Sequence, residues 1–129
     1  MSFQCQGFPI LSVVIATKNR AEALRTISLP SLLNQREKNF EVLVWDASDS
    51  LDSCEVVSKF EKSFAEQGIS LNHFVAPRSG LVSQRNDAIK KAKGKVVFFI
   101  DDDCEVSPDG IRGLWECFVQ HPEVMGCGL

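Results

Sequence analysis

The sequence lacks the features that would indicate a membrane span, a secretory leader or a nucleic-acid partner. No apolar stretch among its 129 residues approaches the roughly 20 that cross a bilayer, and its first residues lack the charged-then-apolar order of a signal peptide. The net charge of -3 argues against nucleic acid, because no basic face is evident beyond the lysines of segment 90–95. We therefore expect a cytoplasmic globular protein.

The five cysteines, at positions 5, 54, 104, 117 and 127, include no pair with the two-residue spacing of a zinc knuckle. Their odd number also argues against a disulfide framework, so we expect reduced thiols. Cys104 is expected to be a small buried thiol, because no nearby histidine could activate it as a nucleophile. His73 and His121 are interpreted as structural.

Short apolar runs alternate with longer helical patterns along the whole chain. The predicted strands are 11–16, 40–45, 70–75 and 96–100, and the predicted helices are 20–34, 51–67, 82–93 and 108–120. Continuous apolar strands separated by helices predict an α/β fold, a Rossmann-like three-layer sandwich with a mostly parallel sheet. Pro30 predicts a kink or two short helices in the first helical stretch, and Ser107 or Pro108 is expected to open the last one.

The most informative segment is the apolar strand 96–100, which runs directly into Asp101, Asp102 and Asp103. Adjacent carboxylates repel one another unless a cation or open water lies against them, so this segment predicts a metal or phosphate site. The alternative is a solvated turn in which one aspartate caps the following helix.

The other strand ends carry polar residues that suit a phosphorylated ligand. Ligands of parallel sheets bind outside the carboxyl ends of the strands, where this chain offers Arg20, Asp46, Gly80 and Arg85. Arginines and helix N-termini bind phosphate, and glycine permits close backbone approach. Each residue also has an ordinary explanation as a cap, a turn or a surface side chain. Together with a divalent ion at Asp103, they predict a site for a sugar nucleotide.

The segment 12–20 resembles the opening of the inverting family 2 glycosyltransferases, which have the GT-A nucleotide-diphospho-sugar transferase fold. The resemblance continues through 40–46, 80–89, 94–103 and 121–124 and covers nearly the whole chain. It implies transfer of a sugar from a UDP-, GDP- or dTDP-sugar to the hydroxyl of a glycan or lipid-linked acceptor. It also implies Mn²⁺ or Mg²⁺ as cofactor.

By this resemblance, Asp101 and Asp103 match the Asp-x-Asp motif, with Asp103 as the direct metal ligand. The implied nucleotide-sugar-binding residues are Ala16, Thr17, Asn19, Arg20, Asp46, Gly80, Arg85, Asp101 and Asp102. Thr17 and Asp46 would face the nucleoside, Asp102 the ribose or the sugar, and Arg85 and Arg20 the diphosphate. The metal would offset the charge that develops on the leaving nucleoside diphosphate.

Two departures from the family pattern limit what the resemblance implies. Ala47 stands where many relatives carry a second acidic or amide residue, which leaves the base of the donor open. The resemblance ends at 125–129, in a predicted fifth strand. We therefore expect one domain, 1–129, that is the donor-binding portion of a truncated enzyme without the acceptor half and its catalytic base.

Three further expectations follow from this reading. The bare sheet edge of such a portion favours a homo-oligomer. A longer parent enzyme is expected in the cytoplasm, with peripheral attachment to a membrane as an alternative. The competing function is a non-catalytic nucleotide-sugar-binding module or an inactive remnant.

Other α/β enzyme classes fit the sequence less well. Receiver domains and haloacid-dehalogenase-like phosphatases need acidic residues after the first strand, where this chain has Thr17, Lys18 and Asn19. Sugar-nucleotide pyrophosphorylases carry a glycine-rich loop there, which is missing. A purely structural domain would bind neither nucleotide nor metal.

Overall fold

The computed structural model describes residues 9–123 and residue 126. One four-stranded sheet has the order β3-β2-β1-β4, and every neighbouring pair is parallel. Its strands are β1 (Leu11–Thr17), β2 (Phe40–Asp46), β3 (Ser70–Val75) and β4 (Val96–Asp101). The helical elements are α1 (Ala21–Ala23), the π-helical turn η1 (Leu24–Ser28), α2 (Leu29–Leu33), α3 (Asp52–Glu66), α4 (Leu81–Ile89) and α5 (Gly110–Gln120).

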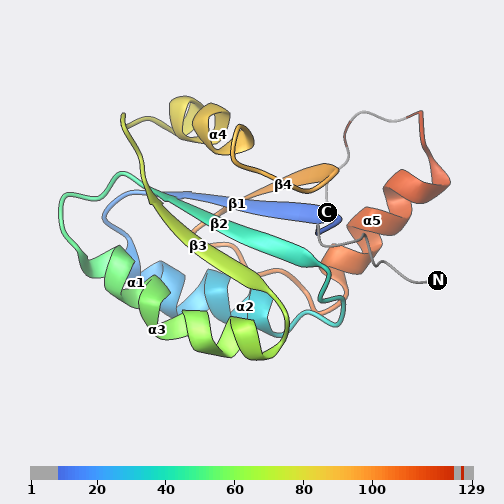
Figure 1. The fold of residues 1–129 in the computed structure, drawn as a ribbon, viewed down its shortest axis with the longest axis horizontal. Coiled ribbons are helices and arrows are strands. Elements are labelled where there is room, and N and C mark those ends of the chain that lie inside the picture. Colours follow the sequence, from blue (N-terminus) through green and yellow to red (C-terminus); the bar gives the residue numbers. More distant parts are fainter. Residues whose placement is uncertain (1–8, 124–125, 127–129) are drawn as a thin grey trace.

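The elements form three layers, with α4 on one face of the sheet and α1, α2 and α3 on the other (Figure 1). The larger core lies between the sheet and the helices α2, α3 and α5, and the smaller one lies under α4. Alternate residues of β1 point to opposite faces, so Val13 and Ile15 enter the larger core and Val14 the smaller. This two-sided burial explains why β1 and β2 are continuously apolar. The predicted α/β sandwich is confirmed.

Three strands extend one residue beyond the predicted bounds, to Thr17, Asp46 and Asp101. Thr17 pairs with Asp46 across β1 and β2, and Ala16 pairs with Asp101 across β1 and β4. The sheet itself therefore fixes the backbone of these polar residues at its carboxyl edge.

The predicted helix 20–34 is divided into α1, η1 and α2. The Leu29 N–H donates to the Leu24 carbonyl, five residues back, and Pro30 follows at the start of α2. Pro30 has no N–H to donate, and the wider turn before it accommodates the break. The expected interruption is therefore a π-helical turn on the N-terminal side of the proline.

Two other helix bounds were predicted wrongly. Helix α4 ends at Ile89 rather than residue 93, because the N–H groups of Lys91 and Ala92 turn to carbonyls three residues back. Helix α5 begins at Gly110 rather than at Pro108, since the Gly110 N–H first closes a turn with the Ser107 carbonyl. The predicted fifth strand at 125–129 lies outside the described residues apart from residue 126.

Candidate functional site

The chain changes direction across the sheet between β1 and β4, since β2 and β3 lie on one side of β1 and β4 on the other. Crevices at such switch points are the usual ligand sites of parallel sheets. A hollow of about 360 Å³ lies at the carboxyl ends of these two strands. It is lined by Ala16, Thr17, Lys18, Arg20, Ser79, Gly80, Leu81, Gln84, Asp101, Asp102 and Asp103.

Asp102 points inward and ties the acidic triplet to β1. Its carboxyl group is buried, accepts a 2.8 Å hydrogen bond from the Thr17 hydroxyl and lies 3.4 Å from Nε of Arg20. Burial raises the pKa of Asp102, and the neighbouring Asp101 and Asp103 act in the same direction. The hydrogen bond from Thr17 and the charge of Arg20 oppose this rise in the pKa.

Asp101 and Asp103 point outward, with side chains that are 56% and 45% exposed. One oxygen of each and the Cys104 sulfur all lie within 4.8 Å of one another. Carboxylate oxygens are the ligands that Mg²⁺ and Mn²⁺ prefer, so Asp101 and Asp103 fit a hard divalent cation. Cys104 is exposed, and the prediction of a buried thiol was wrong. The turn that the Cys104 N–H closes with the Asp101 carbonyl keeps this residue at the surface.

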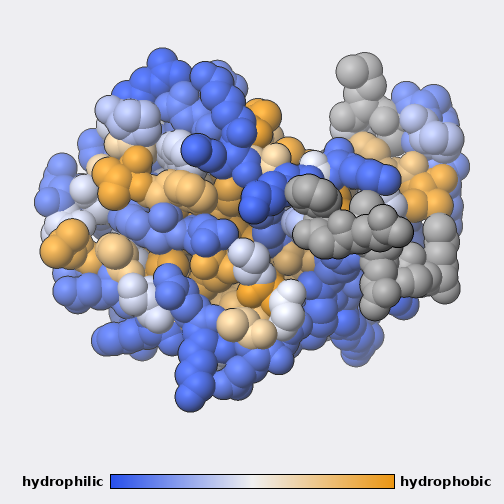
Figure 2. Space-filling model, in the orientation of Figure 1, coloured by the Kyte–Doolittle hydropathy of each residue, from blue (hydrophilic) through white to orange (hydrophobic). Residues whose placement is uncertain are grey.

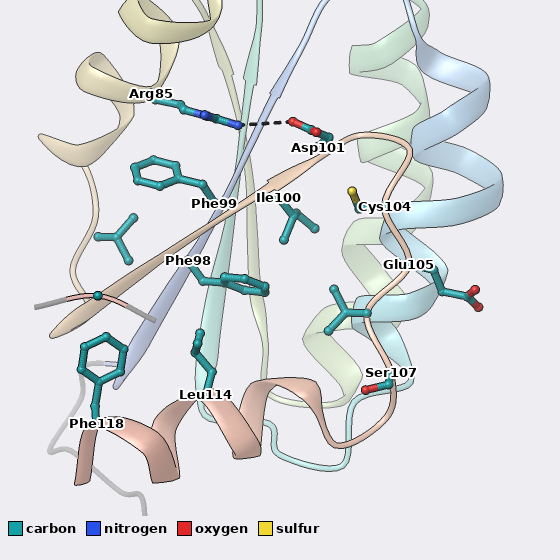
Figure 3. Close-up of a pocket in the computed structure, with 13 residues that line it drawn as sticks. Arg85, Phe98, Phe99, Ile100, Asp101, Cys104, Glu105, Ser107, Leu114 and Phe118 are labelled. Carbon is teal, nitrogen blue, oxygen red and sulfur yellow. Dashed lines mark hydrogen bonds and ion pairs between the residues drawn. The ribbon is translucent and has the colours of Figure 1, made fainter. Parts of the chain in front are cut away.

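Two arginines neutralise the acidic triplet from opposite sides. Arg20 follows β1, and its Nη2 lies 3.1 Å from Oδ2 of Asp103. Arg85 comes from α4, and its Nη2 lies 3.3 Å from Oδ1 of Asp101 (Figure 3). The Arg85 guanidinium also lies 5.4 Å from the centre of the Phe99 ring, a cation–π geometry.

The start of α4 is held against the strand ends by a residue that sequence reasoning missed, Gln84. Its amide nitrogen donates to the carbonyls of Thr17 at 3.1 Å and Trp45 at 3.0 Å, and its oxygen accepts from the Gly80 N–H at 3.2 Å. Gly80 has φ 122°, which favours glycine. Gln84 and Ala88 are both buried at helical spacing, so a polar residue on the buried face of α4 was the available signal.

Asn19 lies beside the hollow rather than on its lining. Its backbone, at φ 57°, donates to the Ser48 hydroxyl at 2.7 Å. Its side-chain amide exchanges two hydrogen bonds with Asp49, at 2.9 and 2.8 Å. Asn19 therefore joins the loops that follow β1 and β2.

Asp46 is also off the lining, and its carboxyl group is engaged within the chain. Oδ1 accepts from the Ser48 N–H at 2.8 Å, and Oδ2 lies 2.8 Å from Nε2 of His73. Both side chains of the pair with His73 are largely buried. A direct contact of Asp46 with a nucleoside stays a prediction.

A second, more apolar cavity of about 750 Å³ runs along β4 and is bordered by α5 (Figure 3). Phe98, Leu114 and Phe118 line it, and β4 is only half-buried although it is as apolar as β1. Figure 2 shows hydrophobic residues at the surface between α4 and the opposite helix layer; Val75 and Val82 are more than 70% exposed. Self-association through such surfaces stays a prediction.

The family model described as glycosyl transferase family 2 matches residues 12–128. A GalNAc(5)-diNAcBac-PP-undecaprenol beta-1,3-glucosyltransferase of Campylobacter jejuni is 33% identical over 108 residues, which are 84% of this chain and 34% of that protein. The chain thus spans about a third of this relative.

Solved structures share the fold. TarS 1–349 of Staphylococcus aureus in complex with UDP-GlcNAc matches 92% of this chain and 36% of that one, with a TM-score of 0.72 and 24% identity. The mannosyltransferase PcManGT of Pyrobaculum calidifontis, in complex with GDP-Man and Mn²⁺, matches 86% of this chain and 32% of that one, with a TM-score of 0.71 and 19% identity. Among the described residues no helix is long and apolar enough to cross a membrane. With the GT-A fold and a family match over nearly its whole length, the chain belongs to glycosyltransferase family 2.

Proposed function

We propose that this chain binds the donor of an inverting, metal-dependent glycosyl transfer, a nucleoside diphosphate sugar. The observation that carries the proposal is the hollow at the switch point, where Asp101 and Asp103 face outward beside two arginines. A diphosphate needs positive charge close to it, and outward carboxylates at 4.8 Å or less can hold the cation that supplies that charge.

Asp101 and Asp103 would hold Mn²⁺ or Mg²⁺, with Asp103 as the principal ligand. The bound cation would offset the negative charge that develops on the leaving nucleoside diphosphate. Arg85 and Arg20 would bind the diphosphate, and Asp102, fixed by Thr17, would lie near the ribose or the sugar.

The remaining predicted residues would shape the nucleoside side of the site. Ala16, Thr17 and Gly80 lie on the lining of the hollow, where Ala16 and Thr17 are largely buried and form its floor. We assign Asn19 and Asp46 to holding the two loops beside the nucleoside, because their side chains are bonded to those loops.

We propose that these residues form the donor half of the whole protein. The acceptor site and the catalytic base would lie in the other half. The Campylobacter relative is named for an undecaprenol-linked acceptor, which supports a lipid-linked or glycan acceptor here. We place the reaction in the cytoplasm, with the whole protein peripheral to a membrane.

Thermal unfolding with UDP, GDP, CDP and dTDP, each with Mn²⁺ and again with a chelator, tests the donor site. A ligand present at 100 times its Kd adds about 2.7 kcal/mol to the free energy of unfolding. We expect a metal-dependent shift with one nucleotide. A cooperative transition that no nucleotide shifts would contradict the proposal. If the whole protein bound a sugar nucleotide without hydrolysis or transfer, that result would favour the non-catalytic binding module.

A further inference from the structure

We propose that Arg85 is an exchangeable counter-ion. It neutralises Asp101 when no divalent cation is bound, and it moves to the diphosphate when Asp101 becomes a metal ligand. Metal and nucleotide then bind with positive coupling through this one side chain. The inference rests on the proposed function, which supplies the cation and the diphosphate.

The two arginines of the site differ in what would hold them once a cation binds. Arg20 lies 3.1 Å from Asp103 and 3.4 Å from the buried Asp102, so it keeps a carboxylate partner if Asp103 turns to a metal. Arg85 contacts one carboxylate within the described part of the chain, that of Asp101. A cation between Asp101 and Asp103 would therefore displace Arg85 rather than Arg20.

The surroundings of Arg85 allow this movement. Its side chain is about one-third exposed and extends over the Phe99 ring, a face that tolerates sliding of a planar cation. Arg85 lines the cavity along β4 rather than the polar hollow, and it contacts Asp101, which lines both (Figure 3). A planar guanidinium can bind two diphosphate oxygens at once, which replaces the lost ion pair.

This exchange has a thermodynamic consequence. Before nucleotide is present, the bond between Arg85 and Asp101 competes with metal binding. A diphosphate that accepts Arg85 removes this competition, so nucleotide raises the affinity for metal. By linkage, metal raises the affinity for nucleotide by the same factor.

The test is the variant R85Q, studied in two titrations. Free Mn²⁺, followed by its electron paramagnetic resonance signal, is titrated against the protein without nucleotide. We expect the Mn²⁺ affinity to rise about three- to fivefold, since an exposed ion pair is worth up to about 1 kcal/mol. The affinity for UDP or GDP at saturating Mn²⁺ is expected to fall at least about tenfold, because a charge-assisted contact is lost. An arginine with a merely structural role would not move the two affinities in opposite directions.

R78Q is the matched control, because it removes the same charge from an exposed arginine that pairs with Asp87 outside the hollow. We expect both affinities of R78Q to match those of the parent chain within about twofold. R85K keeps the charge but not the planar fork, so its Mn²⁺ affinity should lie closer to that of the parent than R85Q does. Cooperative thermal unfolding checks that each variant is folded.

Three results would overturn the inference. If the parent binds Mn²⁺ and nucleotide but R85Q leaves the Mn²⁺ affinity equal or lower, the exchange is wrong and the donor site stands. If R78Q raises the Mn²⁺ affinity as much as R85Q does, net charge rather than this ion pair is responsible. If the parent binds neither ligand, the proposed function fails together with the exchange.

Discussion

The two ends of the sheet place charged and polar side chains in opposite situations. At the amino end, the Ser12 hydroxyl donates to Oε2 of Glu41 at 2.6 Å, and the Lys93 N–H donates to the same oxygen at 2.7 Å. The Gly94 N–H donates to the Ser12 hydroxyl at 2.8 Å. Ser12 and Glu41 are buried, so this network is closed within the chain.

At the carboxyl end, the acidic triplet is open. Only Asp102 is buried, while Asp101 and Asp103 face solvent with arginines as loosely held counter-ions. The closed network joins β1, β2 and the approach to β4, and it stabilises the register of the sheet. The open cluster contributes little to stability and leaves coordination sites for a ligand. Substitutions at the two ends should therefore separate stability from binding.

The largest expected effect is on stability, from G94A at the closed end. A Cβ at residue 94 would lie 2.7 Å from the backbone of Leu11 and Ser12, which cannot move without disturbing β1. We expect a loss of about 3 kcal/mol in the free energy of unfolding. Urea denaturation measures it. G113A is the control, since nothing lies within 4 Å of its added Cβ, and it should be neutral or slightly stabilising. Equal stability of G94A and the parent would contradict the close approach.

The next effect is on binding, from D103A at the open end. We expect the Mn²⁺-dependent affinity for nucleotide to fall about 30-fold, or about 2 kcal/mol, as expected for loss of a metal ligand. The free energy of unfolding should change little, because the side chain is half-exposed. Isothermal titration calorimetry measures the affinity. D109A removes another exposed aspartate, which pairs with Arg36 outside the hollow, and should bind normally. Undiminished binding by D103A would remove Asp103 from the metal site.

The variant E41Q, at the amino end of the sheet, should lower the free energy of unfolding by less than G94A does. The amide can accept the two hydrogen bonds through its oxygen, but a neutral acceptor replaces a buried charged one, which weakens both bonds. We expect a loss of about 1.5 kcal/mol in unfolding free energy and unchanged nucleotide affinity. E61Q, at an exposed position of α3, is the control. A parallel loss of nucleotide affinity in E41Q would mean that the two ends are coupled.

The sequence predicts the strands and the acidic motif better than it predicts contacts that depend on which strands lie side by side. The strands were predictable because burial on both faces leaves a continuous apolar run, as in β1. The acidic motif was predictable because it interrupts such a run. The π-helical turn before Pro30 was not, because an extra residue in one turn barely changes the helical hydrophobic pattern.

The partners of polar side chains depend on the lateral order of the strands, which the sequence does not state. The order β3-β2-β1-β4 puts His73 of β3 beside Asp46 of β2, and it separates Asp46 from the triplet by the whole of β1. Gln84 was missed for the same reason, since its acceptors are the carbonyls of two different strands.

The variant D102N tests the acidic triplet at the carboxyl end of the sheet, because Asp102 is the one buried residue of that triplet. Burial raises the pKa of this carboxyl, so its ionised form opposes folding at neutral pH. We expect D102N to raise the free energy of unfolding slightly at pH 7, since the Thr17 hydroxyl can still donate to the amide oxygen. Nucleotide affinity should fall. Chemical denaturation at pH 7 measures the gain, and a clear destabilisation would show that the contact with Arg20 outweighs burial.

The smallest effect is expected outside the lining of the hollow, at the pair of Arg78, which is exposed, and Asp87, whose side chain is 12% exposed. The hydrogen bond and charge of Arg78 hold the pKa of Asp87 below its ordinary value. A carboxyl whose folded pKa is lowered stabilises the chain above its unfolded pKa, near 3.9, and loses that contribution as the pH falls through its folded pKa. The contribution of Asp102 to stability changes with pH in the opposite direction, because its raised pKa makes acidification favour the folded chain.

Melting temperatures measured from pH 7 to pH 3 should thus fall less steeply in D87N than in the parent, and more steeply in D102N. High salt should weaken the D87N difference, because Arg78 is exposed to solvent, and should leave much of the D102N difference, because burial causes it. Equal slopes in the two variants would show that these two carboxyls do not set the acid stability of the chain.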